Sequence, residues 1–158
     1  MIRPATLADI PRLAEWGQRF ADKANLTAHV GYCPESMAAT FQHMIEQDNY
    51  TILVGENGAI GGGYSPHPFN FAHKFAQEVF WWSEGREGLR LLQAFEDWAR
   101  EHCDSLTMIT LESVNPERMA KFYSQVKLKM AEHALEDEII LQLDDLIYPE
   151  FLNYTKWQ

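Results

Sequence analysis

A single carboxylate lies within the most strand-like run of the sequence. Glu78 stands among mostly apolar and aromatic residues in the run 75–82, which contains no glycine or proline. If partial burial raises its pKa, a carboxylate there can deprotonate an ammonium group, directly or through water. The structural alternative is an ordinary strand glutamate paired with a lysine or arginine. Glu78 is therefore a candidate general base, and both interpretations stay open.

A short polar turn follows this run and leads into a helical pattern. Residues 83–88 read Ser-Glu-Gly-Arg-Glu-Gly, and an apolar stripe with helical spacing extends from Leu89 to Cys103. A strand that enters a glycine-containing turn and then a helix presents unpaired backbone N–H groups at the positive end of the helix dipole. Such a turn can bind a pyrophosphate, although most glycine-containing turns only cap a helix.

Metal and thiol chemistry have little support in the sequence. His67 and His73 are six residues apart without a third ligand nearby, so we expect no metal site. Cys33 and Cys103 form no CxxC pair, and we interpret both as reduced structural residues. The glycine triplet 61–63 lies inside an expected hairpin, where it indicates a bend or a close backbone approach rather than a phosphate loop.

Alternating strands and helices are predicted to position these groups. Thr6 and Asp9 form a capping-box pattern at the start of the first helix, and Pro34 suits the start of the second. Asn57-Gly58 is a hairpin signal, and residues 65–71 are expected to form a loop. We expect helices that begin near residues 6, 34, 89 and 115, and strands at 2–5, 50–55, 59–65, 75–82, 106–111, 127–132 and 138–143.

This element order predicts one α/β (α+β) domain over residues 1–158, with a mixed sheet. Hydrophobic residues make up 46% of the chain, which excludes disorder, and no apolar run is long enough to span a bilayer. The net charge of −10 makes nucleic acid a poor partner. Because the chain begins Met1-Ile2-Arg3-Pro4, without an apolar signal stretch, we expect a cytoplasmic protein.

Four segments carry a resemblance to a known family. They are residues 2–10, the strand 78–82, the strand, turn and helix of 82–92, and the run Asn115-Pro116-Glu117-Arg118-Met119-Ala120-Lys121-Phe122-Tyr123. Together they resemble the GNAT superfamily of acyl-CoA-dependent N-acyltransferases, whose Asn…Ala-x-Phe-Tyr helix is matched at every named position. The resemblance covers residues 2 to about 141. It implies a mixed, mostly antiparallel central sheet flanked by about four helices, with acetyl-CoA as co-substrate.

The resemblance assigns the CoA pyrophosphate to the turn before the long helix. The family pattern there is Gln/Arg-x-x-Gly-x-Gly/Ala, which falls on Ser83, Arg86 and Gly88, and only Gly88 matches. Arg86 can compensate as a cation beside the phosphates, whereas the alternative is a solvent-facing turn arginine. The cofactor-binding residues implied by the resemblance are Phe80, Trp82, Ser83, Gly85, Arg86, Gly88, Leu89 and Asn115.

Catalytic roles also follow from the resemblance. Tyr123 matches a tyrosine that lies near the CoA sulfur and protonates the departing thiolate, a role that suits a phenol with a pKa near 10. The alternative for Tyr123 is core packing with a hydroxyl at the rim. Asn115 matches a residue near the pantetheine arm and also suits an N-cap. Backbone N–H groups near Phe80 to Trp82 are expected to polarise the acetyl carbonyl, and Glu78 is the candidate base, with the ordinary strand glutamate as the open alternative.

The predicted function is therefore acetyl transfer from acetyl-CoA to a primary amine by direct attack. The alternative is a GNAT-like domain that has lost efficient cofactor binding and serves as a binding or structural protein. Expected partners are a small-molecule or peptide amine, with a homodimer as an open possibility and no nucleic acid or membrane.

The resemblance implies that the acceptor lies between three segments, which here are 25–33, 65–74 and 131–143. Candidate lining residues are His29, Tyr32, His67 and Glu136. Residues 131–150 contain seven acids and no lysine or arginine, which favours a cationic amine or is only a solvated acidic surface. The apolar tail 144–158 is expected to dock on its own domain or on a partner.

Overall fold

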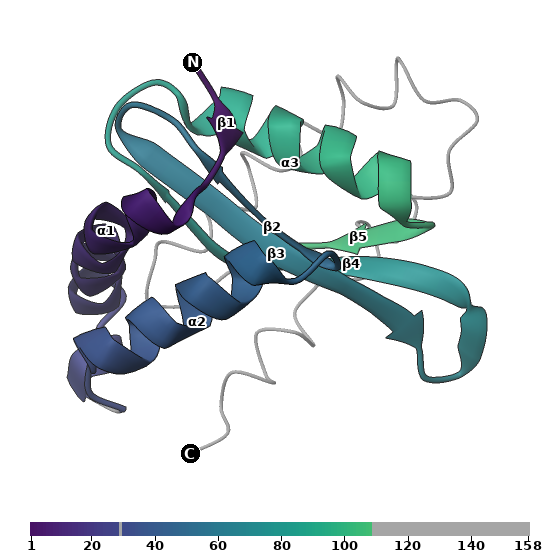
Figure 1. The fold of residues 1–158 in the computed structure, drawn as a ribbon, viewed down its shortest axis with the longest axis horizontal. Coiled ribbons are helices and arrows are strands. Elements are labelled where there is room, and N and C mark those ends of the chain that lie inside the picture. Colours follow the sequence, from purple (N-terminus) through teal and green to yellow (C-terminus); the bar gives the residue numbers. More distant parts are fainter. Residues whose placement is uncertain (29, 109–158) are drawn as a thin grey trace.

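The computed structural model describes residues 1–28 and 30–108, which form a five-stranded sheet with helices on both faces (Figure 1). The strands are β1 (Arg3–Pro4), β2 (Tyr50–Val54), β3 (Gly58–His67), β4 (Asn70–Ser83) and β5 (Ser105–Thr107). The α-helices are α1 (Ile10–Lys23), α2 (Pro34–Glu46) and α3 (Gly88–His102), and the short 3₁₀ helices are η1 (Leu7–Asp9) and η2 (Leu26–Ala28).

The sheet has the strand order β1-β2-β3-β4-β5. All neighbours pair antiparallel except β4 and β5, which are parallel and joined through α3. The mixed, mostly antiparallel sheet of the prediction is thus confirmed. The predicted helix from Asn115 and the last two predicted strands lie outside the described residues.

The 3₁₀ helix η1, which leads directly into α1, begins where the capping box predicts a helix start. Asp9 accepts hydrogen bonds from the backbone N–H of Thr6 at 2.8 Å and from its hydroxyl at 3.0 Å. Arg3 donates two further hydrogen bonds of 2.8 Å to the same carboxylate. These hydrogen bonds hold the pKa of Asp9 far below its usual range, and those from Arg3 have the largest effect. The start of α1 is therefore fastened to β1.

The loop expected over residues 65–71 is instead part of a hairpin. β3 continues to His67 and β4 starts at Asn70, so only residues 68 and 69 turn. The prolines of this segment, Pro66 and Pro68, favour a loop in the local sequence. β2 pairs with β3 only as far as Gly63, so Pro66 lies on an edge stretch, where a missing N–H is tolerated. The long β3–β4 hairpin extends past the helices (Figure 1).

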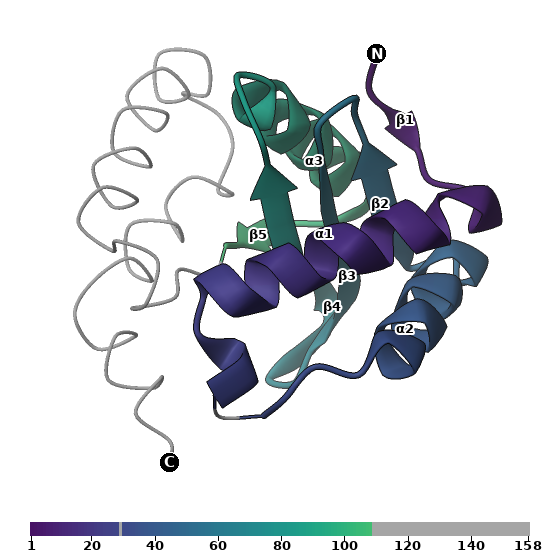
Figure 2. The same cartoon turned by 90° about the vertical axis from the view of Figure 1, so that its left-hand side faces the viewer.

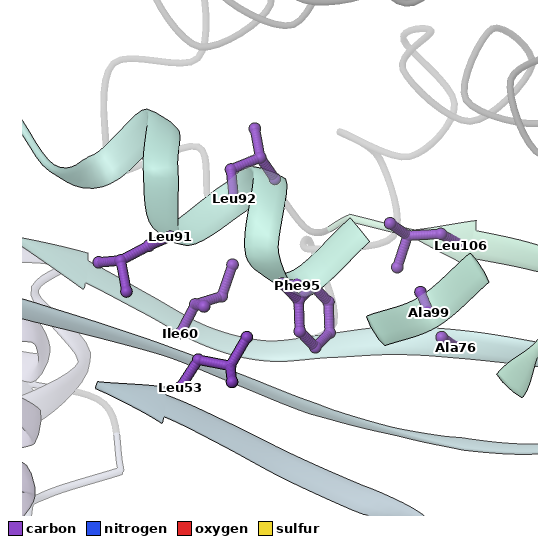
Figure 3. Packing of buried hydrophobic residues seen from close by; sticks show 8 residues of the cluster. All are labelled: Leu53, Ile60, Ala76, Leu91, Leu92, Phe95, Ala99 and Leu106. Atoms are coloured by element: carbon purple, nitrogen blue, oxygen red, sulfur yellow. The ribbon is translucent and has the colours of Figure 1, made fainter. Parts of the chain in front are cut away.

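The helix α3 packs on one face of the sheet through its apolar stripe. Phe95 is fully buried between α3 and the strands, and Leu91 points toward Ile60 of β3 (Figure 3). Burial of side chains of this size is the main favourable term of folding. The cluster, called the α3 core here, comprises Leu53, Ile60, Ala76, Leu91, Leu92, Phe95, Ala99 and Leu106.

The helices α1 and α2 cover the opposite face (Figure 2). The two helices contribute Leu13, Trp16, Phe41 and Met44 to a second cluster, and β2 and β3 contribute Ile52, Val54 and Ala59. Phe41 stacks edge-on against Phe80 of β4, with ring centroids 5.3 Å apart. The sheet therefore separates two cores, and β4 contributes to both.

Candidate functional site

The strand β4 contains a β-bulge in its second half. Phe80 pairs with Gly61 and Glu78 pairs with Gly62, so Val79 is skipped in the register with β3. A bulge of this kind bends the strand and interrupts the regular ladder of backbone hydrogen bonds. It lies two residues beyond the end of the β4–β5 pairing, which covers residues 75–77 among those described.

The bulge decides which face of the sheet each following side chain occupies. Ala76 belongs to the α3 core, and Glu78, two residues later, shares that face. Beyond the bulge the order is shifted: Phe80 and Trp82 pack with α1 and α2, whereas Trp81 packs on the α3 core. The neighbouring tryptophans therefore lie on opposite faces of the sheet, Trp81 on the α3 core and Trp82 in the wall of a cavity.

The candidate base Glu78 is buried, with 6% of its surface exposed. Its strand position is as predicted, but its face was not predictable without the bulge. Because Phe80 and Trp82 lie on the opposite face, the carboxylate and the cavity are on different sides of the sheet.

The glycine triplet 61–63 makes room for neighbouring groups. A Cβ atom on Gly62 would lie 2.3 Å from the backbone oxygen of Gln77 and 2.5 Å from Cζ of Phe95. Both distances are shorter than real Cβ contacts. The predicted close backbone approach is confirmed, and it occurs directly opposite the bulge.

The turn between β4 and α3 is held by a buried acid that the sequence did not single out. Glu87 is 6% exposed, and its carboxylate accepts hydrogen bonds from the backbone N–H groups of Glu56, at 3.2 Å, and of Asn57. Gly85 adopts a left-handed φ of 116°, which glycine allows. The start of α3 is therefore tied to the turn between β2 and β3.

Two arginines lie beside the N-terminus of α3. Arg86 and Arg90 are exposed and form no ion pair with a described residue, whereas Glu84 is paired with Arg19 at 2.6 Å. Cations are unfavourable near a helix N-terminus, so two of them there indicate a site suited to an anion. Arg90 was missed by the sequence reasoning, although a cation in a first helical turn is a usable signal.

The same turn contains a buried hydroxyl without a partner. The Oγ atom of Ser83 makes no hydrogen bond in the described structure. A Cβ atom on Gly88 would lie 3.4 Å from Cβ of Ser83, so the first residue of α3 packs back on the end of β4. The free N–H groups at the start of α3 and the two exposed arginines are donors of the kind that suit a pyrophosphate, and the Glu87 carboxylate opposes them.

An apolar cavity of about 290 Å³ lies on the other face of β4, against α1 and α2. Tyr32, a predicted acceptor-lining residue, is in its wall, and burial raises the pKa of this tyrosine. Its hydroxyl donates to the backbone oxygen of Ala14 at 2.6 Å. The full wall is formed by Leu13, Trp16, Gly17, Phe20, Ala21, Leu26, Val30, Gly31, Tyr32, Met37, Thr40, Phe41, Met44, Val79, Phe80 and Trp82.

Several residues that were predicted to belong to the site do not line this cavity. His67 lies at the end of β3, with its ring centroid 6.0 Å from that of His73, and it is not part of the cavity wall. Among residues 1–28 and 30–108, no group of three possible ligands is close enough to hold a metal ion. The predictions on His29, Asn115, Tyr123 and Glu136, on the acidic stretch 131–150 and on the tail 144–158 lie outside the described residues.

Solved structures with a similar fold were found, whereas neither a protein-family profile nor a curated protein sequence matches the chain. A putative acetyltransferase from Agrobacterium tumefaciens is 20% identical, with a TM-score of 0.60, over 78% of this chain and 90% of that one. A predicted acetyltransferase from Clostridium acetobutylicum, described with acetyl-CoA, is 13% identical, with a TM-score of 0.61, over 78% and 87%. The chain has the GNAT fold.

A further solved structure with this fold is described differently. It is a transcriptional regulator from Bacillus halodurans, 20% identical, with a TM-score of 0.64, over 80% of this chain and 90% of that one. At these identities the similarity establishes the GNAT fold alone. Within the described part of this fold, no helix is both long and apolar enough to cross a membrane.

Proposed function

We propose that the protein is an N-acetyltransferase that transfers the acetyl group of acetyl-CoA to a primary amine. The observation that carries this proposal is the run formed by the β4 bulge, the β4–α3 turn and the N-terminus of α3. It joins an interrupted strand to a set of donors suited to a pyrophosphate. The fold shared with solved proteins described as acetyltransferases supports the same activity.

The proposed reaction is a direct transfer. The neutral amine nitrogen attacks the thioester carbonyl carbon, a C–N bond forms, the C–S bond breaks, and CoA leaves as a thiolate. The attacking nitrogen gives up a proton, and the thiolate takes one up. No covalent bond to the protein forms in this scheme.

The chain's own groups divide this work between them. Backbone N–H groups around the bulge, near Phe80 and Trp82, polarise the thioester carbonyl as negative charge develops on its oxygen. Glu78 accepts the proton of the incoming ammonium. The proton reaches it through water and not by direct contact, because the carboxylate and the cavity lie on opposite faces of β4. Tyr123 donates a proton to the thiolate, and Asn115 contacts the pantetheine arm.

The donors at the start of α3 hold the phosphates in this proposal. The backbone N–H groups from Gly88 to Arg90, which have no intrahelical partner, point to an anion, and Arg86 adds a positive charge. The remaining positions of the turn, Ser83, Gly85 and Leu89, complete the path between the strand and the helix.

A second function is favoured by one specific observation. The carboxylate of Glu87 occupies the turn between the last two positions of the pyrophosphate pattern and is engaged with the β2–β3 turn. A fixed negative charge there opposes phosphate binding. If that effect dominates, the domain is a binding or structural protein that keeps the GNAT fold without efficient acetyl transfer.

Calorimetric titration with acetyl-CoA separates the two functions. We expect binding by the wild-type protein, and a loss of at least about tenfold in affinity for Arg86→Glu, because a charge-assisted contact becomes a repulsion. Lys74→Glu is the matched control, since it reverses one charge at an exposed position of β4, away from the β4–α3 turn that contains Arg86. No heat of binding at millimolar acetyl-CoA would favour the binding or structural function.

A further inference from the structure

The cavity beside the bulge has an unusual wall for a site that is to receive an amine. Among residues 1–28 and 30–108, none of those that line the cavity is an aspartate, glutamate, lysine, arginine or histidine. The hydroxyl groups of Tyr32 and Thr40, the two among the described lining residues, are both used internally: Tyr32 donates to the backbone oxygen of Ala14, and Thr40 donates to the backbone oxygen of Ser36 at 2.9 Å. The described part of the wall therefore provides no counterion for a cationic group, and it favours apolar groups.

Aromatic rings form much of this wall. Trp16 and Phe20 come from α1, Phe41 from α2, and Phe80 and Trp82 from β4. Rings that meet at an angle, as Phe20 and Trp82 do at 87°, leave faces and edges that suit a further aromatic group. A dry apolar cavity of roughly 150 Å³ accommodates benzene. The volume of about 290 Å³ therefore accommodates an aromatic ring with a short side chain.

The cavity is also placed next to the bulge. Val79, the skipped residue of β4, lines the cavity together with Phe80 and Trp82. The same residues form the stretch to which the proposed function assigns the thioester carbonyl. A ligand whose apolar end fills the cavity would thus present its other end beside this stretch of β4.

We propose that the acceptor is a primary amine carried on an aromatic or similarly bulky apolar group, and that this group occupies the cavity formed by α1, η2, α2 and the bulge of β4. The inference rests on the proposed acetyl transfer and names its substrate class. An apolar surrounding also disfavours the ammonium form of the amine, so it favours the neutral form that attacks the thioester.

Variants that fill the cavity test this assignment. Ala21 lies in the wall and is 5% exposed, so Ala21→Leu removes space from the interior. Val30 is also part of the wall but 80% exposed, so Val30→Trp narrows the cavity with little risk to folding. Ala39→Leu is the matched control, because it makes the same change at an exposed position of α2 outside the wall.

The probes are 2-phenylethylamine and 1,5-diaminopentane, with acetyl transfer followed by release of the CoA thiol. We expect kcat/KM for 2-phenylethylamine to exceed that for the diamine by at least about tenfold. Ala21→Leu and Val30→Trp should lower the value for the aromatic amine by about tenfold, whereas Ala39→Leu should leave the values for both amines unchanged. Equal values for both amines, or no effect of either variant, would overturn the inference while the acetyl transfer stands.

Calorimetry with 2-phenylethylamine alone makes the test independent of activity. Binding to the wild-type protein and to Ala39→Leu, with loss in Ala21→Leu, supports the assignment even if acetyl-CoA fails to bind and the proposed function falls. A different occupant is also detectable. If hexanoyl-CoA is preferred over acetyl-CoA and Ala21→Leu removes that preference, the cavity holds the acyl chain and the assignment to the amine is wrong.

Discussion

Two carboxylate side chains near the candidate site, those of Glu87 and Glu96, are buried. Glu87 is satisfied by backbone donors from a turn about thirty residues earlier in the chain. Glu96 lies on α3, is 4% exposed, and has a pKa raised to about 7, chiefly by burial, although Arg100 partly opposes that effect. Neither burial can be read from local periodicity, because tertiary contacts cause both.

The raised pKa of Glu96 makes stability depend on pH. The folded protein binds a proton at this residue more tightly than the unfolded chain, so the stability that Glu96 contributes is fully present below pH 4.5 and is lost as the pH rises through about 7. Glu96→Gln removes this dependence and should stabilise the protein at pH 8 by on the order of 3 kcal/mol. Urea unfolding at pH 5 and pH 8 measures the effect.

Glu101, an exposed acid near the end of α3, provides the control for this prediction. Glu101→Gln removes a charge from the same helix at an exposed position and should leave the pH dependence unchanged. An equal slope of unfolding free energy against pH in the wild-type protein and in Glu96→Gln would contradict the assignment to Glu96.

Other residues of the candidate site were predictable from the sequence. The position of Glu78 on a strand and the alternation of Trp81 and Trp82 follow from the two-residue period of a β-strand. Tyr32 was expected near an acceptor because of the segment that contains it. Arg90 and Glu87 were not identified, because the pyrophosphate pattern of the turn specifies neither position.

At the scale of elements, the bulge of β4 couples the two faces of the sheet. Without it, Phe80 would share the face of Glu78 and Ala76, and the cavity would lose part of its wall. The sequence predicts the strand but not the bulge, since Val79 is an ordinary strand residue. The space opposite the bulge is supplied by the glycines of β3.

Gly62→Ala should therefore destabilise the protein. Its new Cβ atom would lie 2.3 Å from the backbone oxygen of Gln77, a contact that β4 can relieve only by moving. We expect a loss of about 2 kcal/mol in the free energy of unfolding, as for other overpacked sites. Gly88→Ala is the control: its Cβ would meet Ser83 at an ordinary 3.4 Å in the first turn of α3, so denaturant unfolding should show little change. A Gly62→Ala variant as stable as the wild-type protein would show that the strands tolerate a side chain there.

Element boundaries were predictable where local chemistry determines them. The capping box at Thr6, Pro34 at the start of α2 and the Asn57-Gly58 hairpin signal all agree with the structure. The continuation of β3 through Pro66 was not predictable from the local sequence. A proline ends a strand only where a neighbouring strand would accept a hydrogen bond from the missing N–H. That information is in the sheet order and not in the local sequence.

At the scale of the whole molecule, charge and cavity act over different distances. The net charge of −10 attracts any ammonium compound, while the cavity wall of uncharged residues distinguishes between their apolar parts. Seven of the acids lie in residues 131–150, outside the described part of the chain. Long-range attraction is screened by salt, whereas contacts inside an apolar cavity are not, so the two contributions can be separated.

Salt should therefore change the rate with which amines are captured but not the selection of their apolar group. Raising the ionic strength from about 0.01 M to about 0.1 M shortens the Debye length from about 30 Å to about 10 Å. We expect kcat/KM to fall for 2-phenylethylamine and to fall more steeply for 1,5-diaminopentane, because the diamine carries two positive charges. The relative loss caused by Ala21→Leu with the aromatic amine should be the same at both ionic strengths. If neither amine responds to salt, the acidic composition serves solubility alone; if the Ala21→Leu effect shrinks with salt, the variant acts through charge and not through the volume of the cavity.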